Sequence, residues 1–307
     1  MDMDMDLISI IIPCYNASKT IEKCVSTLFL QSYTNIEILA IDDGSTDNTN
    51  EVLNKLAESD PRLIVLTQEN KGVSCARNKG IEISKGKYIS FVDADDHVDV
   101  NYIKRMHDIL IREKTQLVIS KYLIGDDNPK DNANLDISDK KSLIKEMMIP
   151  KHNIGSFVFN RLYVREIITS NSITFDPDIY VCEDILFNYE YLKHAESFSI
   201  CDEYLYFYVI NPQGTMFSDG FNLKKLSANK AFTRMLKSCD NEVKKPIEIS
   251  AMLYNLIVKR QIYKNHINVD SDDLKTINHM LKMNPMGFLK ADIALKYKVA
   301  YPFWLFR

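Results

Sequence analysis

The stretch LISIIIPCYNASKTIEKCVSTLFLQSYTNIEILAIDDGS, residues 7–45, holds the pattern that decides the fold. Two short apolar runs, 7–13 and 36–42, are rich in β-branched residues, and a segment with helical character, 18–30, lies between them. Runs that are apolar on both faces are typical of strands in a sheet that is covered on both sides. The alternation continues at 46–58, 62–67, 73–84 and 87–93. This order predicts an α/β fold, with a mostly parallel sheet and helices on both faces.

The chain changes character after residue 100. The next expected elements are a helix, a strand, a helix and a strand, near 101–113, 117–124, 138–149 and 201–210. From 221 onward the sequence predicts a helical region, with candidate helices near 222–238, 247–268, 271–283 and 287–299.

Length and composition predict a packed globular protein. The 307 residues are 46% hydrophobic and 26% charged, which excludes a disordered chain. No apolar run approaches the roughly 18 residues needed to span a bilayer. The start, MDMDMDLISI, is acidic where a secretory signal needs positive charge, so a cytoplasmic location is expected. Six cysteines without a C-x-x-C pair indicate buried or free thiols rather than zinc sites or disulfides.

Charge is distributed unevenly along the chain. The net charge is −4, yet residues 221–307 carry 16 Lys and Arg against 7 Asp and Glu, which indicates an anionic partner for this end. The last residues mix aromatic side chains such as Trp304 with cations such as Lys296 and Lys298. This mixture suits the headgroup region of an anionic bilayer. A helix that packs on the body of the protein, or on a second copy in a homo-oligomer, is the alternative.

Residues 87–99, KYISFVDADDHVD, run from an apolar strand directly into a cluster of acids. If the extended conformation persists, Asp93 and Asp95 point to one side and Ala94 to the other. Two carboxylates on one side can hold a hard divalent cation such as Mg²⁺ or Mn²⁺. A solvated turn or a helix cap is the alternative. An acidic face argues against nucleic acid as a partner, because phosphate backbones are bound by positive charge.

Polar groups follow three of the predicted strands, PCYN at 13–16, DDGSTD at 42–47 and DADD at 93–96. In a parallel α/β sheet, ligands bind beyond the carboxyl ends of the strands, so these groups are expected to converge. The sequence contains no G-x-x-x-x-G-K-[ST] motif and no G-x-G-x-x-G at the first turn. The chain therefore lacks the glycine-rich means of holding phosphates and has the carboxylate-plus-metal means.

Three blocks closely resemble the family 2 glycosyltransferases with a GT-A fold: SIIIPCYNASKTIEKCVSTLFLQSYTNIEILAIDDGSTDNT (9–49), NKGVSCARNKGI (70–81) and GKYISFVDADD (86–96). A later stretch, 158–192, resembles the acceptor half of bacterial members that build polysaccharides. The resemblance implies a nucleotide-sugar-binding half at 1–100 and an acceptor-binding half at 101–220. The basic helical region at 221–307 would follow them.

The activity implied by this resemblance is inverting, metal-dependent transfer of a hexosyl or N-acetylhexosaminyl group. The donor would be a UDP-sugar, and the acceptor a hydroxyl of a glycan or lipid-linked glycan of the capsule, exopolysaccharide, lipopolysaccharide or teichoic acid type. The cofactor would be Mn²⁺ or Mg²⁺. A lipid-linked acceptor would bring the chain to the inner face of the cell membrane.

The resemblance also implies the residues of the donor side. Pro13, Tyr15, Asn16 and Asp43 would lie near the nucleoside, where Asp43 can accept a hydrogen bond from the uracil imide and Tyr15 can stack on the ring. Core packing is the alternative for Tyr15. The remaining donor and metal residues implied are Lys71, Arg77, Asp93, Ala94 and Asp95.

Arg77 offers a fixed fork of donors that suits either a diphosphate or neighbouring acids, and a solvated surface arginine is the alternative. Asp95 would bind the metal directly, and Asp93 would contact the ribose or the metal.

The acid pair of CEDIL, residues 182–186, is implied to supply the catalytic base. Asp184 would take the proton of the acceptor hydroxyl, and Glu183 would orient it or bind the acceptor. Favourable interaction with a helix dipole is the structural alternative for such a pair. Asn160, Arg161 and Asp96 would lie near the acceptor or the sugar.

Two other functions are compatible with parts of the sequence. A sugar nucleotidyltransferase needs a glycine-rich loop after the first strand, and PCYNASKT has no glycine. A catalytically silent, nucleotide-sugar-binding scaffold subunit of a glycan assembly complex is the second alternative. Retention of both acidic motifs disfavours it.

Overall fold

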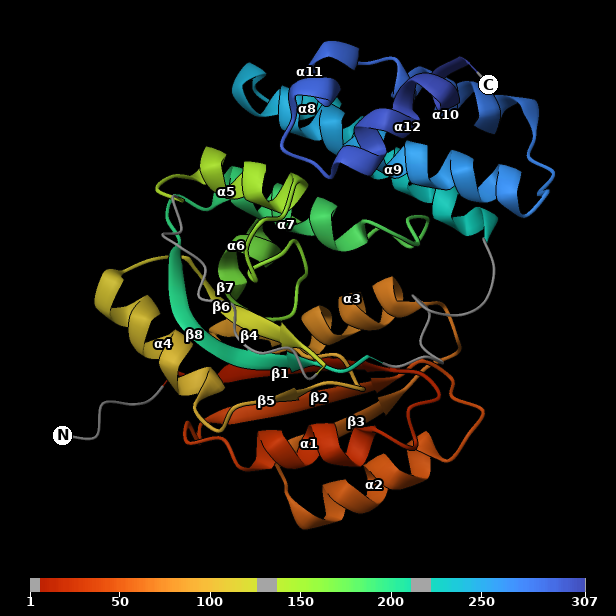
Figure 1. Ribbon diagram of the computed structural model, residues 1–307. Helices are drawn as coiled ribbons and strands as arrows, with labels where there is room; N and C mark the ends of the chain where they lie inside the picture. Colours follow the sequence, from red (N-terminus) through yellow and green to blue (C-terminus); the bar gives the residue numbers. More distant parts are fainter. Residues whose placement is uncertain (1–5, 126–136, 211–221, 307) are drawn as a thin grey trace.

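The computed structural model describes residues 6–125, 137–210 and 222–306. In the first hundred residues strands and helices alternate as the sequence predicts (Figure 1). These elements are β1 (Ile8–Cys14), α1 (Ile21–Phe29), β2 (Ile36–Asp42), α2 (Thr49–Ser59), β3 (Leu63–Thr67), α3 (Val73–Ile83) and β4 (Tyr88–Phe91).

The middle of the chain contributes β5 (His97–Val98), α4 (Tyr102–Glu113), β6 (Leu117–Ile124), α5 (Lys140–Met148), β7 (Arg161–Val164), α6 (Arg165–Ser170), α7 (Glu183–His194) and β8 (Ser199–Tyr208). The four elements predicted here are confirmed as α4, β6, α5 and β8. Four elements were not predicted: β5, β7, α6 and α7. The first three are each too short to show a periodic apolar pattern.

One sheet runs through the described residues in the order β3-β2-β1-β4-β7-β6-β8-β5. β1 pairs in parallel with β2 and β4, and β2 pairs in parallel with β3. β7 lies antiparallel between β4 and β6, β8 is parallel to β6, and β5 is antiparallel to β8 at the far edge. The mostly parallel sheet is therefore confirmed, with β7 as the reversed strand that joins its two halves.

Helices cover both faces of this sheet, with α1 and α2 on one side and α3, α6 and α7 on the other (Figure 1). Side chains of β1 alternate between two hydrophobic cores. Ile8, Ile10 and Ile12 pack in the core that includes residues of α1, α2 and α4. Ile11 packs in the core that includes residues of α3, α5 and α7. This alternation explains why the strand reads as a continuous apolar run.

The C-terminal region is helical, with η1 (Leu223–Ser227), α8 (Ala228–Ser238), α9 (Asn241–Lys264), α10 (Ser271–Leu281), α11 (Pro285–Lys290) and α12 (Leu295–Phe306). The single helix predicted near 287–299 is wrong, because the chain leaves the helix after Lys290 and starts a new one at Leu295. The helix predicted near 247–268 begins earlier, at Asn241, with Pro246 inside it. Proline is disfavoured inside a helix, so the predicted helix was started after Pro246, which is too late.

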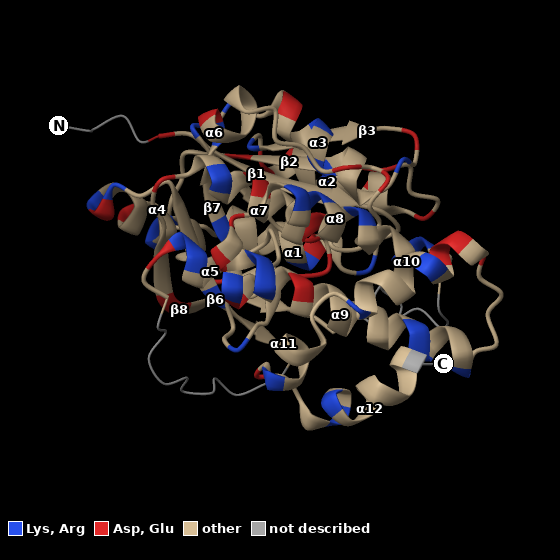
Figure 2. Cartoon of the chain, turned by 90° about the horizontal axis from the view of Figure 1, so that it is seen from above, with Lys and Arg blue, Asp and Glu red and all other residues tan. Residues whose placement is uncertain are grey.

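Part of this region shares a core with the sheet. Phe232 of α8 and Ile247 of α9 are buried in the same cluster as Phe91 of β4. A separate cluster holds α9 to α10, α11 and α12, around residues such as Leu256 and Tyr301. Lys and Arg recur along these helices (Figure 2). Within the described residues, no helix combines the length and the apolar character that crossing a bilayer requires.

Candidate active site

The predicted convergence of strand ends is present at the carboxyl edge of β1, β2 and β4. Asp43 N–H donates to the Cys14 carbonyl at 2.8 Å, which joins the end of β2 to the end of β1. The side chain of Asn16 accepts from the Thr46 N–H at 2.8 Å, and the Asn16 N–H donates to Ser45 Oγ at 3.0 Å. The loops after the first two strands are therefore joined to each other, and Asn16 makes the hydrogen bonds that connect them.

The carboxylate of Asp43 organises the loop before α3. It accepts hydrogen bonds from the Lys71 N–H at 2.9 Å, the Gly72 N–H at 2.7 Å and the Gln68 side chain at 2.8 Å. Gly72 has a φ of 89°, a conformation that glycine adopts without strain. A carboxylate offers about four acceptor positions, so these three bonds leave one for a ligand. Contact between Asp43 and a base stays a prediction.

The other predicted donor residues differ in exposure. Tyr15 is 50% exposed, so core packing does not explain it, and its ring is available for stacking. Lys71 has a 61% exposed side chain, with Nζ 3.9 Å from Glu69. Pro13 is half-buried and Ala94 is buried. Tyr15 and Lys71 are thus the predicted donor side chains that project furthest into solvent.

Arg77 is the centre of the site. This residue of α3 is 4% exposed, and its guanidinium meets carboxylates from two distant parts of the chain. Nη2 lies 3.1 Å from Asp93, whereas Nη1 lies 3.1 Å from Glu183 and 2.8 Å from Asp184. Of the two roles considered for Arg77, contact with neighbouring acids is therefore confirmed. Contact with a diphosphate stays a prediction.

The acid pair begins α7. Glu183 and Asp184 occupy its first turn, where the helix dipole favours negative charge. Cys182, just before them, has a φ of 70°, in the left-handed region that a non-glycine residue rarely adopts. Such a backbone costs about 1–3 kcal/mol and is typical of residues that aim functional groups. Asp184 Oδ2 also accepts from the Val158 N–H at 3.4 Å, so both of its oxygens have partners.

Burial changes the protonation of this cluster. It raises the pKa of Glu183 to about 8, and repulsion from Asp184 adds to the rise against the attraction of Arg77. Burial likewise raises the pKa of Asp93, despite the opposing charge of Arg77. For Arg77 burial acts to lower the pKa, but the charges of Asp184, Asp93 and Glu183 outweigh it, so the pKa is raised. The guanidinium remains charged, and Glu183 holds its proton at neutral pH.

Asp96 does not face a cleft. It is 1% exposed, and its carboxylate accepts from Tyr206 Oη at 2.6 Å and from the Val209 N–H at 2.7 Å. The same tyrosine oxygen accepts from the Asp93 N–H at 3.1 Å. Both carboxylate oxygens of Asp96 thus have partners, and its expected contact with an acceptor or sugar stays a prediction. Its position ties the end of β8 to the acidic loop.

Asn160 and Arg161 are also fully buried, and their expected contact with an acceptor stays a prediction. The guanidinium of Arg161 donates to the carbonyl of Phe157 and, at 2.8 Å, to that of Gly155. The Asn160 amide donates to the carbonyls of Ser120 and Ile154. Arg161 thus satisfies carbonyls of the loop before β7, and Asn160 satisfies one carbonyl of that loop and one of β6.

Two carboxylates remain as candidate metal ligands. Asp93 has a 27% exposed side chain, and Asp95 is half-buried on the same loop. Hard oxygen ligands of this kind fit Mg²⁺ or Mn²⁺. In the part of the chain that the structure describes, no cluster of three or more Asp, Glu, His or Cys side chains could hold a metal ion. An ion on Asp93 and Asp95 would therefore need further ligands, such as phosphate oxygens and water.

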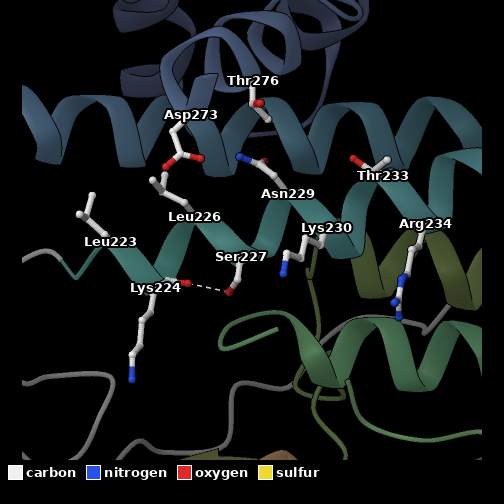
Figure 3. A pocket seen from close by; sticks show the side chains of 10 residues that line it. All are labelled: Leu223, Lys224, Leu226, Ser227, Asn229, Lys230, Thr233, Arg234, Asp273 and Thr276. Carbon is white, nitrogen blue, oxygen red and sulfur yellow. Dashed lines mark hydrogen bonds between the residues drawn. The ribbon is translucent and has the colours of Figure 1, made fainter. Parts of the chain in front are cut away.

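A hollow of about 540 Å³ lies elsewhere, between the start of α8 and α10 (Figure 3). Lys224, Lys230 and Arg234 extend from its wall toward the same side (Figure 3). Arg234 pairs with Asp176 at 2.6 Å, and Tyr180 N–H donates to Ser227 Oγ at 2.8 Å. The full lining is Leu223, Lys224, Leu226, Ser227, Asn229, Lys230, Thr233, Arg234, Asp273 and Thr276. The hollow thus borders the segment that leads into the acid pair, a feature the sequence did not predict.

Comparison with known proteins gives a consistent result. Residues 9–170 match the family model described as glycosyl transferase family 2. An uncharacterized glycosyltransferase of Bacillus subtilis strain 168, EpsJ, is 33% identical over 212 residues, which are 67% of this chain and 62% of that protein. The match therefore spans less than two thirds of that relative.

Solved structures share the fold. TarS 1-349 of S. aureus in complex with UDP-GlcNAc has a TM-score of 0.71 at 18% identity and covers 98% of this chain and 90% of its own. The mannosyltransferase PcManGT of Pyrobaculum calidifontis, in complex with GDP-Man and Mn²⁺, has a TM-score of 0.64 at 13% identity, covering 99% and 88%.

Proposed function

Because this chain belongs to glycosyl transferase family 2, we propose that it moves a sugar from a UDP-sugar to a hydroxyl of a glycan acceptor with inversion. The observation that carries the proposal is the Arg77 cluster. It brings Asp93, in the motif that follows β4, together with Glu183 and Asp184 at the start of α7. A donor beside Asp93 and an acceptor beside Asp184 would then lie next to each other, as direct displacement requires.

The acid pair supports a division of roles. Glu183 keeps its proton at neutral pH, because burial raises its pKa to about 8. Asp184 lies 2.8 Å from the charged Arg77, which fixes its orientation. A protonated carboxyl cannot take the proton of the acceptor hydroxyl, which leaves Asp184 as the candidate base of the pair. We therefore assign Asp184 as the base and Glu183 as its positioning neighbour.

In the proposed reaction the acceptor oxygen bonds to the anomeric carbon while the bond from that carbon to UDP breaks. Asp184 takes the hydroxyl proton. Mg²⁺ or Mn²⁺, held by Asp95 and Asp93, would supply charge neutralisation for the diphosphate when bound. Tyr15 would stack on the base, and the remaining acceptor position of Asp43 would receive its imide N–H. Inversion follows from a single displacement.

Replacement of the base tests the proposal. Asp184→Asn should lower sugar transfer by about 10²–10⁴-fold, the usual effect of losing a general base. UDP binding should change less than transfer, because the substitution keeps the size of the side chain and Arg77 keeps its contacts with Asp93 and Glu183. Glu82→Gln, an exposed carboxylate change on α3, is the control and should transfer normally. Transfer at the wild-type rate by Asp184→Asn would reject the assignment.

A catalytically silent scaffold subunit is the second candidate, favoured by the occupation of Asp93 and Asp184 by Arg77. Slow hydrolysis of UDP-sugars without acceptor, dependent on manganese, separates the two. The enzyme should release UDP and lose this activity on chelation, whereas a silent subunit should bind the donor without turnover. We further propose that the acceptor is lipid-linked, which would place the reaction at the inner face of the membrane.

A further inference from the structure

The outer side of the last two helices is apolar. Leu295, Val299 and Phe303 of α12 are 72%, 71% and 56% exposed, and their spacing of four residues sets them in one stripe. Met286 and Leu289 of α11 are 66% and 40% exposed. A surface helix normally turns polar side chains toward solvent and apolar ones toward the core. This exposed stripe lacks the polar character expected of a surface helix.

The opposite side of α12 is already used for packing. Tyr301 is 1% exposed, its ring lies 4.8 Å from that of Phe288, and its hydroxyl donates to the Leu281 carbonyl at 2.7 Å. Buried Lys259 donates to the Trp304 carbonyl at 2.9 Å. These contacts fix the rotation of α12, so the stripe cannot turn inward without breaking them.

The charges around the stripe are positive. Lys290 and Lys296 are exposed, and α12 contains no Asp or Glu (Figure 2). The only acid between residues 282 and 306 is Asp292, which pairs with Lys151 at 2.7 Å. An apolar stripe flanked by cations is the pattern of a helix that lies in the interface of an anionic bilayer.

We propose that the outer face of α11 and α12 docks on an anionic lipid surface. Leu295, Val299 and Phe303 would enter the boundary between headgroups and acyl chains, and Lys290 and Lys296 would meet the phosphates. This inference rests on the proposed function in one respect: docking on lipid would bring the protein to a lipid-linked acceptor. Binding to the lipid surface itself does not require catalysis. A second copy of the chain fits less well, since a two-fold contact would bring the same lysines against one another.

Vesicle binding by the full chain tests the proposal. Vesicles of phosphatidylcholine with about 30% phosphatidylglycerol should bind the wild type, and pure phosphatidylcholine should bind it at least tenfold more weakly. Trp304, the only tryptophan, lies beside Phe303 with ring centroids 5.1 Å apart, so its emission should shift to shorter wavelength on binding. Leu295→Ser/Val299→Ser/Phe303→Ser should lower binding at least tenfold and abolish the shift.

A control variant removes three other exposed apolar side chains, which are 70%, 41% and 48% exposed: Leu30→Ser/Ile64→Ser/Ile111→Ser. It should bind as the wild type does. Equal binding by the two triple variants, or equal binding to neutral and anionic vesicles, would overturn the proposal. Sedimentation showing a dimer that only the stripe variant loses would assign the stripe to a second copy instead. UDP-sugar hydrolysis by the stripe variant should stay at the wild-type rate, so a docking failure is distinct from a catalytic one.

Discussion

Arg77 is the residue on which the two sides of the site depend. It is a buried cation among three carboxylates, with the ring of Phe175 5.3 Å from its Cζ. Breaking such a buried ion pair is strongly destabilising, because a charge is left without compensation. Only the planar fork of arginine can meet Asp93 with one nitrogen and Asp184 with another. The sequence was enough to single out Arg77 as a site residue. That it contacts three carboxylates at once could be seen only in the folded structure.

Glu183 gives a prediction about pH. Its pKa is raised from the usual 4.5 to about 8 in the folded protein, so the native state keeps a proton that the unfolded chain releases in this range. Stability therefore falls as pH rises from about 4.5 to about 8. Glu183→Gln carries no titrating group and should lose this component of the pH dependence. Urea unfolding at pH 5 and pH 8 with chelator present should show a smaller difference for the variant. An unchanged difference would contradict the assigned protonation.

Residue identity alone did not show that Asn160 and Arg161 are buried. Both are polar and lie in a block shared with acceptor-binding halves, yet the backbone around Gly155 and Phe157 takes up their hydrogen bonds. Asn160 also has a φ of 58°, in the left-handed region that asparagine adopts more readily than most residues. A sequence pattern shows neither the backbone conformation of Asn160 nor the carbonyl groups that need a hydrogen-bond donor.

At the scale of elements, α3 carries Arg77 and its distance from β1 sets where the guanidinium lies. Gly80 makes the close approach possible, since a Cβ there would lie 2.3 Å from Ile11 Cγ2. The Asp43 carboxylate holds the loop that enters the same helix. Thus a core glycine and a buried acid, far from each other in sequence, both position the Arg77 cluster.

Gly80→Ala should push α3 away from β1. Overpacking of this kind costs about 1–3 kcal/mol of stability, and sugar transfer should fall because Arg77 moves with the helix. A second change, Ile11→Ala, removes the atoms that clash and should return part of the activity to Gly80→Ala. Transfer kinetics and urea unfolding of the two single variants and the double variant measure the coupling. Additive effects would show that the close contact does not set the position of α3.

The elements themselves were largely predictable where burial imposes a period. β1, β2 and α4 were found because each repeats an apolar pattern over a full element. β7 was missed because only Arg161–Val164 pair in it, and its reversed direction depends on partners on both sides. The break between α11 and α12 was missed because apolar residues continue through it.

For the whole molecule, the boundary expected near residue 220 does not separate the cores. Phe232 and Met235 of α8 pack in the cluster that contains Phe91 and Phe187. The helical region therefore contributes side chains to the hydrophobic core that covers one face of the sheet. Its outermost helices, α11 and α12, contribute instead to the separate cluster around α9.

Truncation tests this arrangement. A chain ending at Ile210 should fail to unfold cooperatively, because it exposes the apolar surface that α8 and α9 cover. A chain ending at Leu281 lacks α11 and α12 alone and should keep a cooperative transition with a lower midpoint. Circular dichroism during urea titration provides the measurement. A cooperative transition in the shorter chain, at the wild-type midpoint, would show that the sheet stands without these helices.

The single guanidinium of Arg77 has a consequence for the order of events. It pairs with Asp93 on one side and with Asp184 on the other, so a nucleotide that drew Asp93 away would leave Arg77 paired with Asp184 and Glu183. In the proposed reaction, arrival of the UDP-sugar would thus change the charge around the acid that takes the proton. We therefore expect steady-state kinetics with a compulsory order, in which the UDP-sugar binds before the glycan acceptor.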